Sequence, residues 1–218
     1  MDKGLKEGGW SGSGLKVVAL ASMTIDHIAC YLMADGMPYE VMRAVGRIAF
    51  PIFAFLLAEG FVHTHSRKAY ALNLLAFALI SEIPWGWLNH DNTHNVFFTL
   101  LLGLIALWGV GRSKGCPCLA VFVTVAVAAV ATILHTDYEW HGVLLIVLFY
   151  LFRKQRLLMA LFTIPVMAEY GLVGYLLALA VLMAYNGRRG FIKTPCAKYM
   201  FYAYYPLHLM VILNLIPL

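Results

Sequence analysis

The chain of 218 residues is too hydrophobic for a soluble protein, because 62% of its residues are hydrophobic and only 12% are charged. A soluble globule of this length needs more polar surface than that. The mean hydropathy of +0.78 therefore predicts an integral membrane protein. The net charge of +5 is weak support for nucleic-acid binding, and we expect no nucleic-acid partner, since there is no separate polar domain to hold a duplex.

Apolar segments recur along the whole chain and predict an all-α, polytopic membrane helical bundle. A span needs about 20 residues, so the short sixth and seventh segments are expected to be tilted, broken or partly re-entrant. About nine segments are present, at residues 15–34, 48–64, 69–88, 96–110, 119–135, 141–152, 156–168, 171–186 and 198–217. Residues 1–14 are expected to be a flexible cytoplasmic segment, and residues 15–218 a single membrane domain.

The charges of the loops predict the orientation in the bilayer, because Lys and Arg accumulate on the cytoplasmic side. Placing the N-terminus and every second loop in the cytoplasm gives that side 14 of the 16 basic residues. Only Arg43 and Arg47 remain on the other side. The N-terminus is therefore predicted to be cytoplasmic and the C-terminus to lie outside.

In the first segment, an acid directly precedes an imidazole. Charged groups at this depth cost several kcal/mol each, so Asp26 and His27 are expected to be functional rather than idle. Adjacent helical residues point about 100° apart, and each should therefore contact a different neighbour. The alternative is a structural ion pair between helices.

Two pairs of polar residues with a spacing of four lie at the outer end of the second segment and within it. Arg43 and Arg47 would share one face of a helix. They are expected either to bind a carboxylate or phosphate, or to neutralise an acid such as Asp26, and the sequence leaves both possibilities open. Glu59 and His63 can form a hydrogen bond, with snorkelling of His63 to the interface as the alternative. No ligand set for a metal is apparent, so no metal is expected.

Further along the chain, polar groups accompany helix-breaking prolines. Glu82 precedes Pro84 in the third segment, where a network with Asp26 and Arg47 is plausible. Tyr205, Pro206 and His208 lie in the last segment, and His208 is a second candidate acid or base. Between them, Asn95 is expected to cap the fourth helix, with substrate binding as the alternative.

These residues stand in runs that together resemble the TraX family. The matching runs are Thr24–His27, Gly46–Phe61, Leu79–Pro84, Asn95–Thr99 and Tyr204–His208, and the resemblance extends from about residue 15 to 217. That family is associated with N-acetylation of pilin subunits and is related to multi-pass membrane acyltransferases. The resemblance implies a protein of the bacterial cytoplasmic membrane that transfers an acetyl group from acetyl-CoA to a small amine or a pilin-like protein, as an N- or O-acetyltransferase.

Such a transfer needs a base for the acceptor's proton and a positive or hydrogen-bonding group for the developing oxyanion. We expect His27 to be the base, Glu82 to orient its imidazole, and Arg47 to stabilise the oxyanion or orient a carboxylate. The candidate catalytic residues are thus His27, Asp26, Glu82 and His208, and the candidate binding residues are Arg43, Arg47, Glu59, His63, Asn95 and Tyr205.

Two other functions use the same charges. A proton-coupled transporter would use them as a proton relay, although the chain shows no internal repeat of the kind many transporters have. In a non-catalytic assembly factor for surface proteins the charges would be structural. For the acyltransferase, the basic loops at 153–156 and 188–189 could attract the phosphates of CoA, but the membrane orientation already accounts for them.

Overall fold

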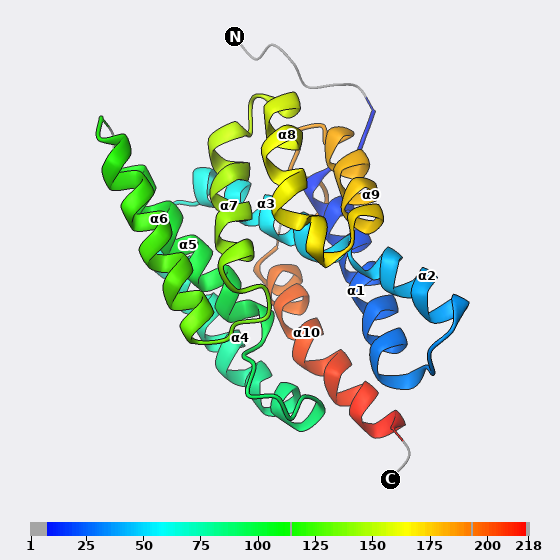
Figure 1. Cartoon of the computed structure of the whole chain (residues 1–218). Helices are drawn as coiled ribbons and strands as arrows, with labels where there is room; N and C mark the ends of the chain where they lie inside the picture. Colours follow the sequence, from blue (N-terminus) through cyan, green and yellow to red (C-terminus); the bar gives the residue numbers. More distant parts are fainter. Residues whose placement is uncertain (1–7, 114, 193, 217–218) are drawn as a thin grey trace. The chain divides into compact units, whose positions relative to one another are not determined.

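The computed structural model describes residues 8–113, 115–192 and 194–216, most of which lie in helices (Figure 1). Among these described residues there are two isolated β-bridges and no strand. The helices are α1 Gly12–Leu32, α2 Met37–Gly46, α3 Ala49–His63, α4 Arg67–Leu88, α5 Val96–Arg112, α6 Pro117–Ile133, α7 Glu139–Phe152, α8 Arg156–Met167, the 3₁₀ turn η1 Ala168–Tyr170, α9 Leu172–Met183 and α10 Pro195–Leu215. The predicted all-α class is confirmed.

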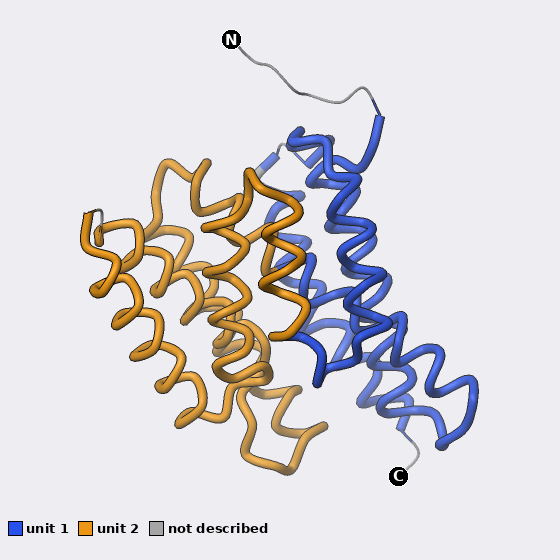
Figure 2. The backbone as a smooth tube through the Cα atoms, turned by 45° about the horizontal axis from the view of Figure 1, so that its top comes forward, with its two compact units in different colours: residues 1–53, 167–218 blue, residues 54–166 orange. Residues whose placement is uncertain are grey.

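The chain divides into two compact units, coloured separately in Figure 2. Unit 1 comprises the described residues of Met1–Phe53 and Met167–Leu218, and so combines both ends of the chain. Unit 2 comprises those of Ala54–Val166, and the division falls within α3. The single domain expected for residues 15–218 stays a prediction.

Polar caps and prolines explain where several helices begin. The side chains of Ser11, Ser66 and Thr194 each accept a hydrogen bond from a backbone N–H of the first turn of α1, α4 and α10. Such caps satisfy donors that have no partner inside the helix. The first turns of α2, α6 and α10 also contain proline, whose missing N–H costs little there.

In unit 1, α1 packs against α2 and α10, and α2 packs against α9. The approach of α1 to α2 depends on Gly46, because a Cβ atom at this position would overlap the carboxyl group of Asp26. Ser22 of α1 lies beside it and directs its hydroxyl to the carbonyl oxygens of Val45 and Gly46, at 2.7 and 3.0 Å. These residues thus bring two backbones together next to a buried acid.

In unit 2, α5 is the central helix and contacts α4, α6 and α7. Two glycines on α5 allow this packing. A Cβ atom at Gly103 would overlap Ile146 of α7, and one at Gly109 would overlap Val123 of α6. Figure 1 shows α5, α6 and α7 as neighbouring helices within this unit.

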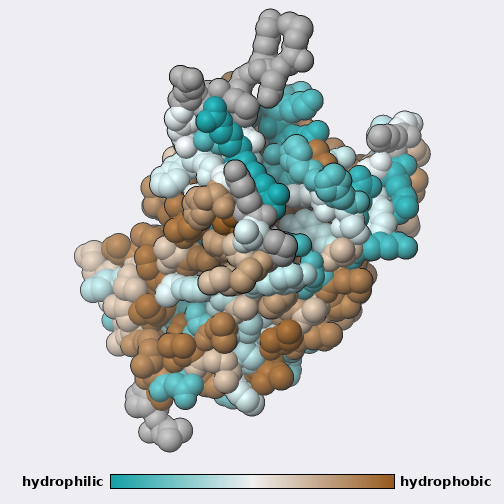
Figure 3. Space-filling view, turned by 180° about the vertical axis from the view of Figure 1, so that it is seen from behind, coloured by the Kyte–Doolittle hydropathy of each residue, from teal (hydrophilic) through white to brown (hydrophobic). Residues whose placement is uncertain are grey.

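Exposed apolar side chains indicate a membrane protein. Three stretches are long and apolar enough to cross a bilayer: Gly12–Leu32, Met37–His63, which joins α2 and α3, and Arg67–Leu88. Four shorter apolar helices follow, α5, α6, α7 and α9. On α6, Phe122 is 69% exposed and Ile133 74%, and brown apolar residues cover much of the face in Figure 3. A membrane helical bundle fits these helices, whereas a count of nine spans stays a prediction.

Two segments differ from expectation. Residues 1–7 of the expected flexible segment lie outside the described residues, but Trp10 is fixed, since its N–H donates to Ala184 and its carbonyl accepts from Asn186, both at 2.9 Å. The second apolar segment is preceded by a separate helix, α2, and the two helices are interrupted at residues 47–48. Pro51 favours this interruption because it cannot donate to the carbonyl of Arg47.

Candidate functional site

Two histidines from opposite ends of the chain meet in unit 1. The Nδ1 atom of His27 in α1 lies 2.7 Å from the Nε2 atom of His208 in α10. The two rings are nearly parallel, with centroids 4.9 Å apart and an interplanar angle of 8°. His208 is buried, and its Nδ1 atom lies 3.0 Å from the carbonyl oxygen of Tyr204.

This chain of contacts assigns the protons on both rings. A carbonyl oxygen only accepts, so the Nδ1–H of His208 donates to Tyr204. The Nε2 atom of a neutral His208 is then an acceptor, and the Nδ1–H of His27 donates to it. The remaining nitrogen of His27, Nε2, carries a lone pair. His27 is therefore arranged as a base whose partner can stabilise the protonated ring.

Aromatic and hydroxyl groups hold the pair in place. Tyr205, which is 4% exposed, lies with its ring centroid 6.2 Å from that of His27 and 5.4 Å from that of His208. The ring of Tyr31 contacts His27 edge-on at 5.8 Å. The hydroxyls of Thr24 and Tyr204 lie 2.7 Å apart and add a second polar contact between α1 and α10. Tyr205, selected from sequence as a binding residue, thus lines the histidine pair.

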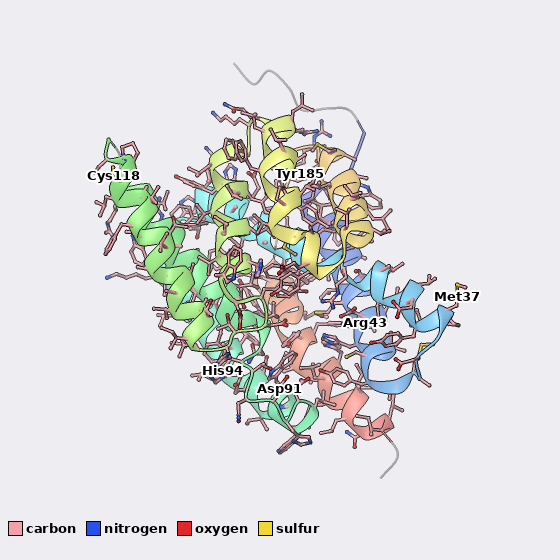
Figure 4. All side chains as sticks on the ribbon, in the orientation of Figure 1. Met37, Arg43, Asp91, His94, Cys118 and Tyr185 are labelled. Carbon is pink, nitrogen blue, oxygen red and sulfur yellow. The ribbon has the colours of Figure 1, made fainter. Side chains whose placement is uncertain are left out.

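Asp26 forms an ion pair with Arg43. The carboxylate Oδ2 atom lies 2.8 Å from Nη1 of Arg43, and both side chains are largely buried, at 16% and 20% exposure. Arg43 extends from α2 (Figure 4). Of the two roles left open for this arginine, the structure shows neutralisation of Asp26. The Oδ1 atom of Asp26 is buried without a hydrogen-bond partner among the described residues.

Arg47 occupies the C-terminal end of α2 beside α9. Its backbone N–H donates to the Arg43 carbonyl at 3.0 Å. A Cβ atom at Gly174 would lie only 2.6 Å from the Cβ of Arg47, so a glycine is needed for this contact. Arg47 is therefore the C-terminal cap residue of α2, one turn after Arg43 and at the start of the interruption before α3.

Glu82 has its own set of partners in unit 2. One carboxylate oxygen binds Nδ1 of His94, and the other lies 2.5 Å from the side-chain nitrogen of Asn95. His94 lies in the loop between α4 and α5 (Figure 4). Its ring is tilted against Phe98 at 5.2 Å, and its backbone is paired with that of residues 135–137. A carboxylate here orients an imidazole.

The orienting role expected of Glu82 toward His27 stays a prediction; the described contacts pair His27 with His208 within unit 1, and Glu82 with His94 within unit 2. Spacing along single helices could not reveal either partner. Asn95 is fully buried, and its side-chain oxygen accepts from the Phe97 N–H at 3.1 Å. Its predicted capping role is confirmed.

Unit 2 also contains the polar pair of Glu59 and His63 and the buried histidine His141. Glu59 and His63 lie 3.7 Å apart, too far for a hydrogen bond, and the His63 side chain is 74% exposed. His141 is buried and stacks on Trp140 with ring centroids 3.6 Å apart. Among the residues described, no group of three or more His, Cys, Asp or Glu side chains could hold a metal ion.

His94 is the functional candidate that sequence reasoning missed. It lies in a polar loop, where a histidine by itself carries little information. One signal in the sequence could have pointed to His94. It directly precedes the helix cap Asn95 and follows Glu82 by twelve residues, so the short connection between the two helices can bring it back to the carboxylate. That connection is closed by the indole N–H of Trp85, which donates to the Thr93 carbonyl at 2.9 Å.

Comparison with known proteins gives matches over nearly the whole chain. A family described as TraX protein matches residues 11–216. The probable fimbrial assembly protein FimC, serogroup H1, of Dichelobacter nodosus is 28% identical over 92% of this chain and 93% of its own length. The uncharacterized protein RP591 of Rickettsia prowazekii (strain Madrid E) is 45% identical over 22% of this chain and 18% of its own. No solved structure matches.

Proposed function

Because this chain belongs to the TraX family, we propose that it is a membrane-embedded acyltransferase that moves an acetyl group from acetyl-CoA to an amine. The observation that carries the proposal is the pairing of His27 with His208, which leaves a lone pair on Nε2 of His27. The fimbrial name of the D. nodosus relative supports a pilin-like protein as the acceptor, and a small amine is the alternative acceptor. The proposed location is the bacterial cytoplasmic membrane.

In the proposed reaction, Nε2 of His27 removes the proton that the acceptor nitrogen loses as it attacks the thioester carbonyl. The new N–C bond forms, the C–S bond breaks, and the sulfur of CoA leaves as a thiolate that receives the proton back from His27. The products are the acetylated amine and free CoA. His208 stabilises the transient imidazolium because its Nε2 accepts from Nδ1–H of His27.

The neighbouring charges have supporting roles in this proposal. The ion pair of Asp26 with Arg43 fixes α1 against α2, and so fixes the backbone that carries His27. Arg47 is assigned to the developing oxyanion or to a carboxylate of the substrate.

The test uses the purified full-length chain in lipid nanodiscs with acetyl-labelled acetyl-CoA. The acceptors are a peptide with a pilin N-terminus and a panel of small amines, and both label transfer and CoA release are measured. We expect transfer by the wild-type chain and its loss in His27→Ala. His90→Ala, which removes an exposed loop histidine, is the matched control. Undiminished transfer by His27→Ala would remove His27 from the catalytic role.

A second candidate is a non-catalytic assembly protein for pilin-like subunits, favoured by the name of the D. nodosus relative. It predicts binding of the pilin peptide without release of CoA. Measuring binding of the pilin peptide to the same nanodiscs, beside label transfer, distinguishes the two functions. Binding that is equal in wild type and His27→Ala, with no acetylated product in either, supports assembly alone.

A further inference from the structure

Unit 2 contains an open, positively charged depression where α3 ends, α4 begins and α5 ends. Its volume is about 420 Å³. Basic and hydroxyl side chains make up most of its lining, namely Arg67, Lys68, Arg112, His65, Thr64 and Ser66, and no acidic side chain contributes. By the loop charges it belongs to the predicted cytoplasmic side.

The two guanidinium groups of this depression are held by aromatic rings. Cζ of Arg67 lies 4.3 Å from the ring centroid of Phe61, and Cζ of Arg112 lies 5.0 Å from that of Trp108. A guanidinium stacked on a ring keeps its N–H edge for an acceptor. Within the described part of the chain, no carboxylate forms an ion pair with Arg67, Lys68 or Arg112. Their donor groups therefore remain available.

The start of α4 adds a second reason to expect an anion. Arg67 and Lys68 are the first two residues of this helix, where the helix dipole disfavours a positive charge. The hydroxyl oxygen of Ser66 accepts a hydrogen bond from the Ala69 N–H at 3.2 Å, and its carbonyl oxygen accepts one from the Tyr70 N–H at 3.1 Å. The N–H groups of Arg67 and Lys68 have no acceptor in the described residues. The positive-inside rule explains why these basic residues lie on the cytoplasmic side, but it does not explain why they are clustered around one depression.

We propose that this depression binds a phosphate group, a ligand that supplies the negative charge and the several acceptor oxygens that these donors lack. The proposed function, on which the identity of the ligand rests, points to a phosphate of the acyl donor CoA. An anionic phospholipid headgroup offers the same chemistry at a membrane surface. The site is distinct from the basic loops at 153–156 and 188–189.

The experiment measures binding without turnover, so its result is independent of acetyl transfer. Wild type, Arg67→Gln and Arg112→Gln are titrated in neutral detergent with CoA and with dephospho-CoA, which lacks one phosphate monoester. Thermal midpoints are then compared in nanodiscs of phosphatidylcholine with and without phosphatidylglycerol. Lys154→Gln, which removes an exposed cation in the turn after α7, is the comparison variant, because its loop at 153–156 is the competing place for a CoA phosphate. Lys68→Gln serves if an arginine variant does not fold, because Lys68 is exposed and its substitution removes charge without loss of packing.

We expect the affinity for CoA to fall by about tenfold or more in the depression variants and to change little in Lys154→Gln. The loss should be smaller for dephospho-CoA. In another outcome, the depression variants keep their affinity for CoA but lose the rise in thermal midpoint that phosphatidylglycerol gives the wild type. The phosphate bound in the depression is then that of a lipid headgroup. If neither ligand distinguishes the depression variants from Lys154→Gln, the proposal is overturned. Phosphate binding here without acetyl transfer by the wild type would retain this site and refute only the proposed reaction.

Discussion

The Nδ1 atom of His27 and the Nε2 atom of His208 lie 2.7 Å apart, although 181 positions separate them in sequence. Because His208 also donates to the Tyr204 carbonyl, the shared hydrogen bond leaves Nε2 of His27 as an acceptor. The hydrogen bond therefore runs from His27 as donor to His208 as acceptor, which makes His27 the base and His208 the residue that positions it.

Substitution of either histidine should separate these two roles. We expect His27→Ala to reduce acetyl transfer by about 10²–10⁴-fold, the usual contribution of a general base. His208→Phe, which keeps a ring but removes the acceptor, should lower the rate less and shift the pH–rate profile, because the His27 imidazolium loses its partner. An unchanged profile in His208→Phe would contradict the positioning role.

Gly46 should tolerate no side chain, because a Cβ atom there overlaps the carboxyl group of Asp26. We expect Gly46→Ala to destabilise the chain by about 1–3 kcal/mol, the range for overpacking. Gly86→Ala is the control, since nothing lies within 4 Å of a Cβ atom at that position of α4. Thermal unfolding in detergent measures both, and equal midpoints for the two variants would show that α1 and α2 do not approach closely at Gly46.

The ion pair of Asp26 and Arg43 should show coupling in a double-mutant cycle. Asp26→Asn or Arg43→Gln alone leaves an uncompensated charge in a largely buried place, at a cost of about 3–5 kcal/mol. We expect the double variant to be less destabilised than the sum of the two single variants. The free energy of unfolding, measured by titration with a denaturing detergent, provides the values, and strict additivity would mean that the two groups do not interact.

Glu82 should stabilise the connection between α4 and α5. Glu82→Gln disrupts the contacts with His94 and Asn95, and we expect a loss of about 1–3 kcal/mol. Hydrogen exchange should become faster at the Phe97 amide, which Asn95 caps. Glu139→Gln is the control, because its pair with His135 is exposed and contributes little. Unaltered exchange at Phe97 in Glu82→Gln would contradict this role.

Asp91 provides a test by pH outside the membrane segments. Its carboxylate accepts from the Thr93 hydroxyl at 2.7 Å and from the Thr93 N–H at 3.1 Å, and these bonds lower the pKa of Asp91. Because the pKa of Asp91 is lower in the folded chain, the bonds stabilise the turn fully at pH values above the ordinary pKa of an aspartate. This stabilisation is lost as the pH falls through the lowered pKa. Carbon NMR titration should show this midpoint, and Thr93→Val should return it toward the ordinary value. A midpoint that Thr93→Val does not move would exclude the hydroxyl as the cause.

Local features of the sequence predicted much of this structure. Each of the nine apolar segments corresponds to a helix, and Asn95 caps α5 as expected, because capping depends on residues close in the chain. The separate helix α2 was missed, since polar residues such as Glu40 and Arg43 interrupt its apolar pattern. Pro51 explains its separation from α3 once the two helices are seen.

The sequence by itself determined that this protein is helical, suited to a membrane and equipped with costly polar groups such as Asp26 and His27. These are properties of composition and of spacing within one helix. Only the tertiary structure decided the partners: His208 for His27, Arg43 for Asp26, and His94 for Glu82. Such pairs depend on which helices pack together and at what rotation, and no spacing rule connects residues as far apart as His27 and His208.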